Sequence, residues 1–133
     1  MKYLLDTHTF IWTVAESMRL SERAKRAIQD PKNEVFISSV NLWEISIKTR
    51  IKKIDMGSVQ ADDLIGLAED MGIQLIGLSP EEAISYGKLE ESSHFDPFDR
   101  MLIWQAISRK YIMISKDSEF EKFVPHGLKL LWK

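Results

Sequence analysis

The sequence contains no cysteine and only three histidines among its 133 residues. Without cysteine the chain can hold no disulfide, no Cys-ligated zinc, no iron–sulfur cluster and no catalytic thiol. The histidines, His8, His94 and His126, are not spaced as a helical zinc motif. A metal ion bound by this chain would therefore have carboxylate ligands, which favours Mg²⁺ or Mn²⁺ over softer ions.

Long apolar runs and a strong net charge are also missing. No apolar stretch reaches the roughly 18 residues that a membrane-spanning helix needs, and the opening stretch MKYLLDTHTF is too short for a secretory signal. We therefore expect a cytoplasmic protein that does not enter a membrane. The net charge of −2 is less basic than that of many nucleic-acid-binding domains. That objection weakens if several carboxylates are gathered at one metal ion.

Short apolar stretches rich in β-formers alternate with longer segments of helical pattern. Strands are expected at 3–6, 35–38, 73–78, 111–115 and 128–132, and helices at 9–15, 21–29, 39–53, 58–72, 79–90 and 96–109. This alternation predicts an α/β sandwich with a mainly parallel sheet of about five strands. A chain of this length without repeats or linkers is expected to form a single domain, residues 1–133.

Four helix starts are marked by local signals. Ser21 and Ser58 are placed as N-caps, and Ser79-Pro80-Glu81-Glu82 forms a capping box with proline at the first helical position. Asp96 is placed as a cap in the same way, because Pro97 follows it directly. These signals fix helix positions independently of the apolar pattern.

Four carboxylates fall where a parallel sheet would place a ligand pocket. Asp6 ends the first expected strand and Asp117 follows the fourth by two residues, and ligands of open parallel sheets bind at the carboxyl ends of strands. Glu44 and Asp99 lie in the early turns of helices that can face the same crevice. Grouped carboxylates repel one another. A divalent cation reverses that cost, and its waters suit phosphoryl chemistry.

Each carboxylate also has a structural explanation. Asp99 can favour a helix N-terminus, Glu44 can pair with Lys48 on a solvated helix face, and Asp117 can belong to a turn. Asp6 is harder to explain in this way, because an acid that ends an apolar strand is poorly solvated unless it faces a cleft. The joint placement of all four favours a metal site.

The stretches around these residues resemble the four acidic motifs of PIN-domain proteins. They are LLDTH at 4–8, LWEIS at 42–46, DPFDRML at 96–102 and ISKDSEF at 114–120. More narrowly, they are similar to the VapC-type ribonuclease toxins of type II bacterial toxin–antitoxin systems. The resemblance implies a three-layer α/β/α fold, Mg²⁺- or Mn²⁺-dependent endoribonuclease activity and a cognate antitoxin partner. It also favours a homodimer.

The metal-binding and catalytic positions of the resemblance fall on Asp6, Glu44, Asp99 and Asp117. Asp96 is interpreted first as a helix cap and second as an outer partner of the metal or its water, a role also open to Thr7. Ser115 stands where a threonine is common, and it keeps a hydroxyl group that could hold a metal-bound water or a carboxylate. Phe95 stands where relatives often carry a basic residue, which puts a substrate contact there in doubt.

Basic and aromatic residues near the motifs can be interpreted either as binding residues or as ordinary surface and core residues. The candidate RNA contacts are Lys48, Arg50, Lys52, Lys53, Arg100 and Lys116. Cationic side chains beside a nuclease cleft would bind phosphates irrespective of sequence. The default interpretation of the first four is nevertheless a solvated surface, and Arg100 and Lys116 could instead be ion-pair partners. Phe10, Ile11, Trp12 and Trp43 are mostly core residues by expectation, and any exposed part would suit an antitoxin helix or self-association.

Two other functions compete with a nuclease. Phosphatases of the aspartyl-phosphate type commonly carry a second aspartate two residues after the first, and here that position is His8. A non-catalytic RNA- or protein-binding module on a PIN scaffold would have lost a motif acid, and all four are present. The sequence therefore favours the nuclease.

Overall fold

The computed structural model describes residues 1–94 and 96–133; Phe95, where a substrate contact was in doubt, lies outside this part. Its strands form one sheet in the order β3–β2–β1–β4–β5, and every neighbouring pair is parallel. The strands are β1 (Lys2–Leu5), β2 (Glu34–Ser38), β3 (Gln74–Ile76), β4 (Ile112–Ile114) and β5 (Lys129–Leu131). The expected parallel sheet is confirmed.

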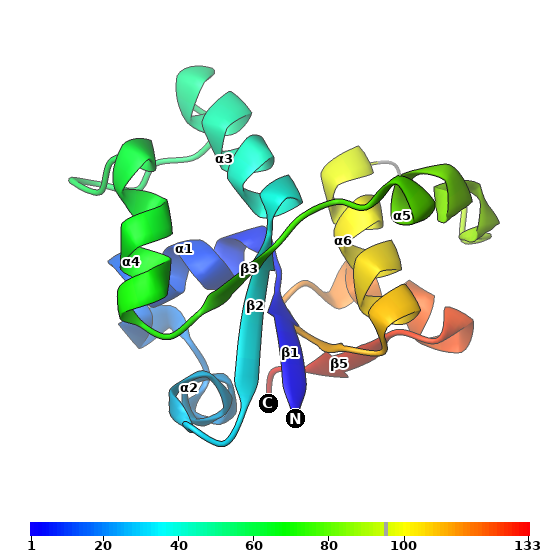
Figure 1. Ribbon diagram of the computed structural model, residues 1–133, viewed down its shortest axis with the longest axis horizontal. Coiled ribbons are helices and arrows are strands. Elements are labelled where there is room, and N and C mark those ends of the chain that lie inside the picture. Colours follow the sequence, from blue (N-terminus) through cyan, green and yellow to red (C-terminus); the bar gives the residue numbers. More distant parts are fainter. Residues whose placement is uncertain (95) are drawn as a thin grey trace.

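Helices cover both faces of this sheet. They are α1 (Thr7–Ala15), α2 (Glu22–Gln29), α3 (Ser39–Arg50), α4 (Leu64–Asp70), α5 (Pro80–Ser85) and α6 (Pro97–Arg109). Shorter 3₁₀ segments lie at Ser17–Arg19, Ala61–Asp63, Tyr86–Lys88 and Ser118–His126. Figure 1 shows α1, α2 and α4 on one side of the sheet and α5 and α6 on the other. This is the expected three-layer α/β/α sandwich.

Alternate residues of the central strands enter two separate cores. Leu5 and Ile37 pack with residues of α1, α2 and α4, whereas Leu4 and Phe36 pack with residues of α6 and the segment after β4. Strands buried on both faces need nearly continuous apolar sequence, as the expected strands had. Each fully buried side chain of this size contributes roughly 1.5–3 kcal/mol, so the central strands rigidly position the residues that follow them.

Three of the four predicted helix starts are confirmed. The Ser21 side chain accepts the Ala24 N–H at 3.0 Å, Ser79 forms its capping box, and Asp96 caps α6. The start at Ser58 is wrong, because α4 begins only at Leu64. The chain between α3 and α4 has no α-helix, and a 3₁₀ turn at Ala61–Asp63 directly precedes α4. Ile54 and Met56, which precede Ser58, are buried in the core.

The expected helix over 79–90 ends early, at Ser85. A 3₁₀ turn at Tyr86–Lys88 follows it and delivers Leu89, which is 5% exposed, into the second core. Burial of Leu89 thus overrides the helical pattern of the sequence. Among the described residues, no helix is both long and apolar enough to cross a bilayer.

A buried ion pair joins α5 to α6. Glu82, which is 6% exposed, accepts Arg109 Nε at 2.7 Å and Gln105 Nε2 at 3.1 Å. It also accepts the Ser79 N–H at 2.9 Å, completing the capping box. Burial works against ionisation of Glu82, but these donors, led by Arg109, lower its pKa to about 2. The ionised carboxylate is therefore a structural element of this face.

Replacing Arg109 with Met should lower the free energy of unfolding at pH 7 by about 2 kcal/mol, because a buried charge loses its partner. The folded-state pKa of Glu82 lies below its usual value, so its contribution is present above about pH 4.5 and is lost as pH falls toward 2. Urea unfolding at pH 7 and pH 3 should show a smaller acid loss in Arg109→Met than in the wild type. Equal stability of Arg109→Met and the exposed control Arg26→Met would contradict this role.

Candidate metal centre

A pocket of about 550 Å³ lies at the carboxyl ends of β1, β2 and β4. It is lined by all four predicted acids, Asp6, Glu44, Asp99 and Asp117. Asp6 directly follows β1, Asp117 follows β4, and Glu44 lies on the helix after β2. The sheet therefore brings together side chains that are more than 100 positions apart in the sequence, as expected for the carboxyl edge of a parallel sheet.

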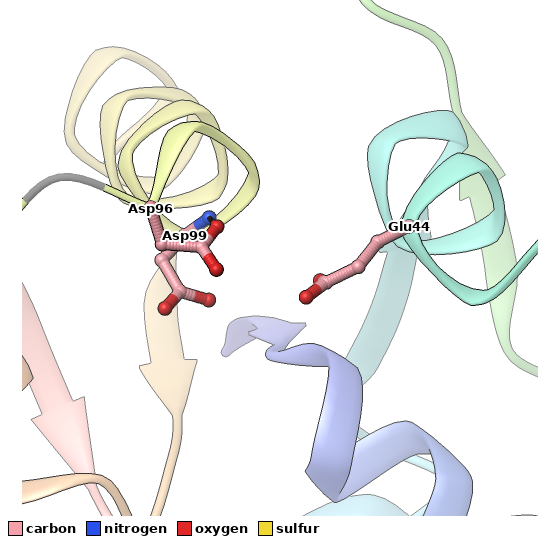
Figure 2. A group of neighbouring side chains, drawn as sticks. All are labelled: Glu44, Asp96 and Asp99. Carbon is pink, nitrogen blue, oxygen red and sulfur yellow. Dashed lines mark hydrogen bonds between the residues drawn. The ribbon is translucent and has the colours of Figure 1, made fainter. Parts of the chain in front are cut away.

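Three carboxylates form the tightest part of this pocket. Glu44, Asp96 and Asp99 each offer an oxygen, and these oxygens lie within 4.8 Å of one another. Figure 2 shows Glu44 extending from α3 toward the two aspartates, which lie together at the start of α6. At this spacing one cation can contact the three groups directly or through its waters.

Asp96 has two functions that use different oxygens. Its Oδ1 caps α6 by accepting the N–H groups of Phe98 at 2.9 Å and Asp99 at 3.1 Å. Its Oδ2 lies 3.3 Å from Lys48 Nζ, inside the cluster. The first interpretation of Asp96, as a helix cap, is confirmed. Asp96 was not predicted as one of the four principal metal-binding acids, although the structure places it beside Glu44 and Asp99.

Asp6 also lines the pocket, and each of its carboxylate oxygens accepts a hydrogen bond from within the protein. Its Oδ1 accepts the Thr9 N–H at 2.9 Å, which caps α1, and its Oδ2 accepts the Ser115 hydroxyl at 2.5 Å. Ser115 Oγ in turn accepts the Asp117 N–H at 3.1 Å. Burial raises the pKa of Asp6 above its usual range, although the hydrogen bonds from Ser115 and Thr9 oppose the shift.

Glu44 is held from the α1 side of the pocket. It is 2% exposed, and its Oε1 accepts the Thr7 hydroxyl at 2.5 Å. Asn41 Nδ2 donates to Thr7 Oγ1 at 3.0 Å and to the Leu5 carbonyl at 3.2 Å. Thr7 thus contacts a motif acid, in the position predicted for an outer partner. Asn41 was missed, although its place three residues after Ser38 is a capping-box spacing, and the structure forms that box.

Lys48 is the cation nearest to the acidic cluster. Its ammonium forms ion pairs with Glu44 and Asp96. Burial opposes the charge, but Glu44 raises the pKa of Lys48. Burial also opposes ionisation of Asp96, whose pKa is lowered by the Asp99 N–H and by Lys48. An internal ammonium therefore offsets part of the repulsion within the cluster.

The negative charge of ionised Asp99 is only weakly stabilised by its surroundings. Burial raises the pKa of Asp99 to about 6, helped by the charges of Asp96 and Glu44 and opposed by a hydrogen bond from His94. His94 Nε2 lies 3.0 Å from Asp99 Oδ2. Apart from the closeness of the two residues in the chain, no sequence pattern indicated this pair. An ionised Asp99 would be favoured by a cation.

The structure separates the candidate RNA contacts into three groups. Lys48 and Lys116 line the pocket. Arg100 instead donates to Tyr86 Oη and to the carbonyls of Leu89, Glu91 and His94, which leaves one of its five N–H groups for a phosphate. The remaining three, Arg50, Lys52 and Lys53, are exposed at the end of α3 and do not line the pocket.

The chain is similar in sequence to a known protein family and to a ribonuclease. The sequence matches the PIN domain family over residues 3–124. It is 29% identical over 114 residues to Ribonuclease VapC22 of Mycobacterium tuberculosis, covering 86% of this chain and 85% of that protein. The family match covers each of the four acidic motifs.

Solved structures show the same fold. VapBC2 from Rickettsia felis, bound to a DNA fragment from its promoter, superposes with a TM-score of 0.72 at 17% identity, covering 100% of both chains. VapBC-1 from nontypeable Haemophilus influenzae gives a TM-score of 0.68 at 19% identity, covering 98% and 97% of the two chains. At such identities the likeness concerns the arrangement of helices and strands.

Replacing Lys48 with Met should destabilise the metal-free protein by about 1–3 kcal/mol, because Glu44 becomes a buried carboxylate without a cation. Mg²⁺ should restore more of the Tm in this variant than it adds to the wild type, since a bound ion takes over the missing charge. Differential scanning calorimetry in EDTA and in Mg²⁺ tests both expectations. Lys53→Met, at an exposed lysine, is the control; the same Tm change in both variants would argue against the role of Lys48.

Proposed function

The chain belongs to the PIN domain family, and we propose that it is a divalent-metal-dependent endoribonuclease acting as the toxin of a toxin–antitoxin pair. The observation that carries the proposal is the gathering of all four motif acids, with Asp96, around one pocket. The likeness to Ribonuclease VapC22 supports RNA as the substrate. In this proposal residues 1–133 are a single nuclease domain that works in the cytoplasm.

The donors of this pocket fit a hard divalent cation. Carboxylate oxygens are ligands that Mg²⁺ and Mn²⁺ prefer, and three of them already lie within 4.8 Å of one another. We propose that Asp6, Glu44, Asp99 and Asp117 hold the ion, directly or through water, and that Asp96 adds an oxygen at the α6 side. When bound, such an ion lowers the pKa of a water molecule and offsets phosphate charge.

The surrounding residues position these acids and the substrate. Ser115 and the Thr9 N–H fix the Asp6 carboxylate, and Thr7 fixes that of Glu44. Lys116 lines the pocket, which supports the proposal that it binds a phosphate of the RNA. Without a cation, the carboxylates would repel that phosphate, so metal dependence follows from the charge of the pocket itself.

The protein partners are proposed from the neighbours and from the exposed apolar surface. One solved neighbour, VapBC-5 from Mycobacterium tuberculosis, is a member of the VapBC family of toxin–antitoxin systems, which supports a cognate antitoxin for this chain. Phe10 and Ile11 are buried and are therefore core residues. Three exposed apolar residues follow one another at every fourth position: Trp43 and Ile47 on α3 and Ile51 at its C-cap, at 60%, 36% and 54% exposure. This α3 stripe is the proposed contact between two copies in a homodimer.

Replacing Asp6 with Asn should reduce RNA cleavage beyond the 10–100-fold typical of residues one contact removed from a metal. The fold should persist, because an asparagine oxygen still accepts the Thr9 N–H that caps α1. The assay uses labelled total RNA and protein freed of any co-purifying partner, in Mg²⁺, in Mn²⁺ and in EDTA. Asp62→Asn, at an exposed aspartate outside the pocket, is the matched control.

The outcomes separate the proposed nuclease from its rival. Cleavage that requires metal and is lost only in Asp6→Asn supports the nuclease and its pocket together. Full activity of Asp6→Asn would remove this residue from the site. RNA that stays intact in every condition while remaining bound to the protein would instead support a non-catalytic binding module.

Replacing Ile51 with Glu should convert a homodimer into a monomer, because a charge on the α3 stripe would be buried without a partner on association. Light scattering after size-exclusion chromatography measures the mass, which should halve. The control is Ile84→Glu, since Ile84 is 87% exposed and belongs to α5. A dimer that survives in Ile51→Glu would place the contact elsewhere.

A further inference from the structure

His94 contacts Asp99 from outside the pocket. Its Nε2 lies 3.0 Å from Asp99 Oδ2, and the two side chains are 14% and 21% exposed. His94 itself is not among the residues that line the pocket. When Asp99 is ionised its carboxylate can only accept a hydrogen bond, and Nε2 of His94 is then the donor. This contact restricts rotation of the Asp99 carboxylate.

The imidazole ring is itself held by aromatic packing. Phe120 and Phe123 both meet it edge to face, with ring centroids 6.0 Å away and interplanar angles of 89° and 81°. Both phenylalanines are buried, at 1% and 0% exposure. Edge-to-face contacts of this kind stabilise one ring orientation. The donor atom therefore has a defined direction before any ligand binds.

The backbone that carries His94 is fixed by the residue after Asp99. Arg100 Nη1 donates to the His94 carbonyl at 3.1 Å, and Nη2 donates to the Leu89 carbonyl at 3.1 Å. The guanidinium also lies over the rings of Tyr86 and Phe123, 5.6 Å and 5.8 Å from their centroids. The first turn of α6 thus presents Asp99 to the pocket and anchors the segment that delivers His94.

We propose that His94 is a positioning residue, which donates from Nε2 to Asp99 and holds its carboxylate in the orientation that a divalent cation requires. Arg100 supports this arrangement because its guanidinium donates to the backbone carbonyls of His94 and Leu89. The inference rests on the proposed metal-dependent function and adds a residue that the four acidic motifs do not contain. Hydrogen-bonded partners of metal-binding carboxylates typically contribute 10–100-fold to metal affinity or activity.

The test compares variants that keep or remove the donor. His94→Gln retains a side-chain N–H that can reach Asp99, whereas His94→Leu fills space between the phenylalanines without a donor. His94→Met, with a flexible apolar side chain, is a second donor-free variant in case the leucine protein is unstable. His126→Leu, at an exposed histidine, is the control. Tm and circular dichroism verify that each variant folds.

Mn²⁺ affinity is measured by electron paramagnetic resonance on protein freed of RNA and partners. The donor-free variants should bind Mn²⁺ about 10–100-fold more weakly, and His94→Gln should recover most of the affinity. RNA cleavage by the donor-free variants should be restored by excess Mn²⁺, which a general loss of structure would not allow.

Each other outcome identifies which idea fails. Wild-type protein that binds no Mn²⁺ would overturn the proposed metal-dependent function, whatever His94 does. Wild-type binding that is unchanged in His94→Leu and His94→Met would overturn the positioning role and leave the proposed function standing. Equal weakening in His94→Gln and the donor-free variants would also overturn it, because ring packing rather than the hydrogen bond would then be responsible.

Discussion

Carboxylates repel one another, and this protein places five of them around one pocket. Helix N-termini supply part of the compensation, because Asp6, Asp96 and Asp117 each accept a backbone N–H at the start of a helical segment. Lys48 supplies another part through its ion pairs with Glu44 and Asp96. What remains uncompensated is the charge that a divalent cation would offset. The repulsion between the carboxylates is thus both what the fold has to offset and what would draw a cation into the pocket.

The order of the strands in the parallel sheet brings the carboxylates together. Since β1 lies between β2 and β4, the residues that leave these three strands converge at one edge. The register pairs Leu5 with Ile114, which brings the next residues, Asp6 and Ser115, within hydrogen-bonding distance at 2.5 Å. β1 and β4 each lead into a helical segment whose first residues line the pocket, so the fold supplies partial positive charge where acids collect.

The first turn of α6 combines two tasks in neighbouring residues. Asp96 and Asp99 face the pocket, while Arg100 faces inward and fixes the backbone that carries His94. Arg100 had been a candidate for binding RNA, and its place beside a motif acid gave no sign of this inward role. A guanidinium with several donors in a planar fork suits the capture of several carbonyl groups.

The amino-acid sequence determined the features that depend on local pattern. Apolar runs located the five strands, capping signals located the starts of α2, α5 and α6, and the positions of the acids at strand and helix ends predicted their shared pocket. The start of α4 differs from the prediction, because the helix begins at Leu64 and not after the cap signal at Ser58. The tertiary structure alone decided the partners that lie far from each acid in the sequence. Lys48 meets Asp96 across 48 positions, and Ser115 meets Asp6 across 109. Such contacts arise from packing between distant segments, which no local pattern records.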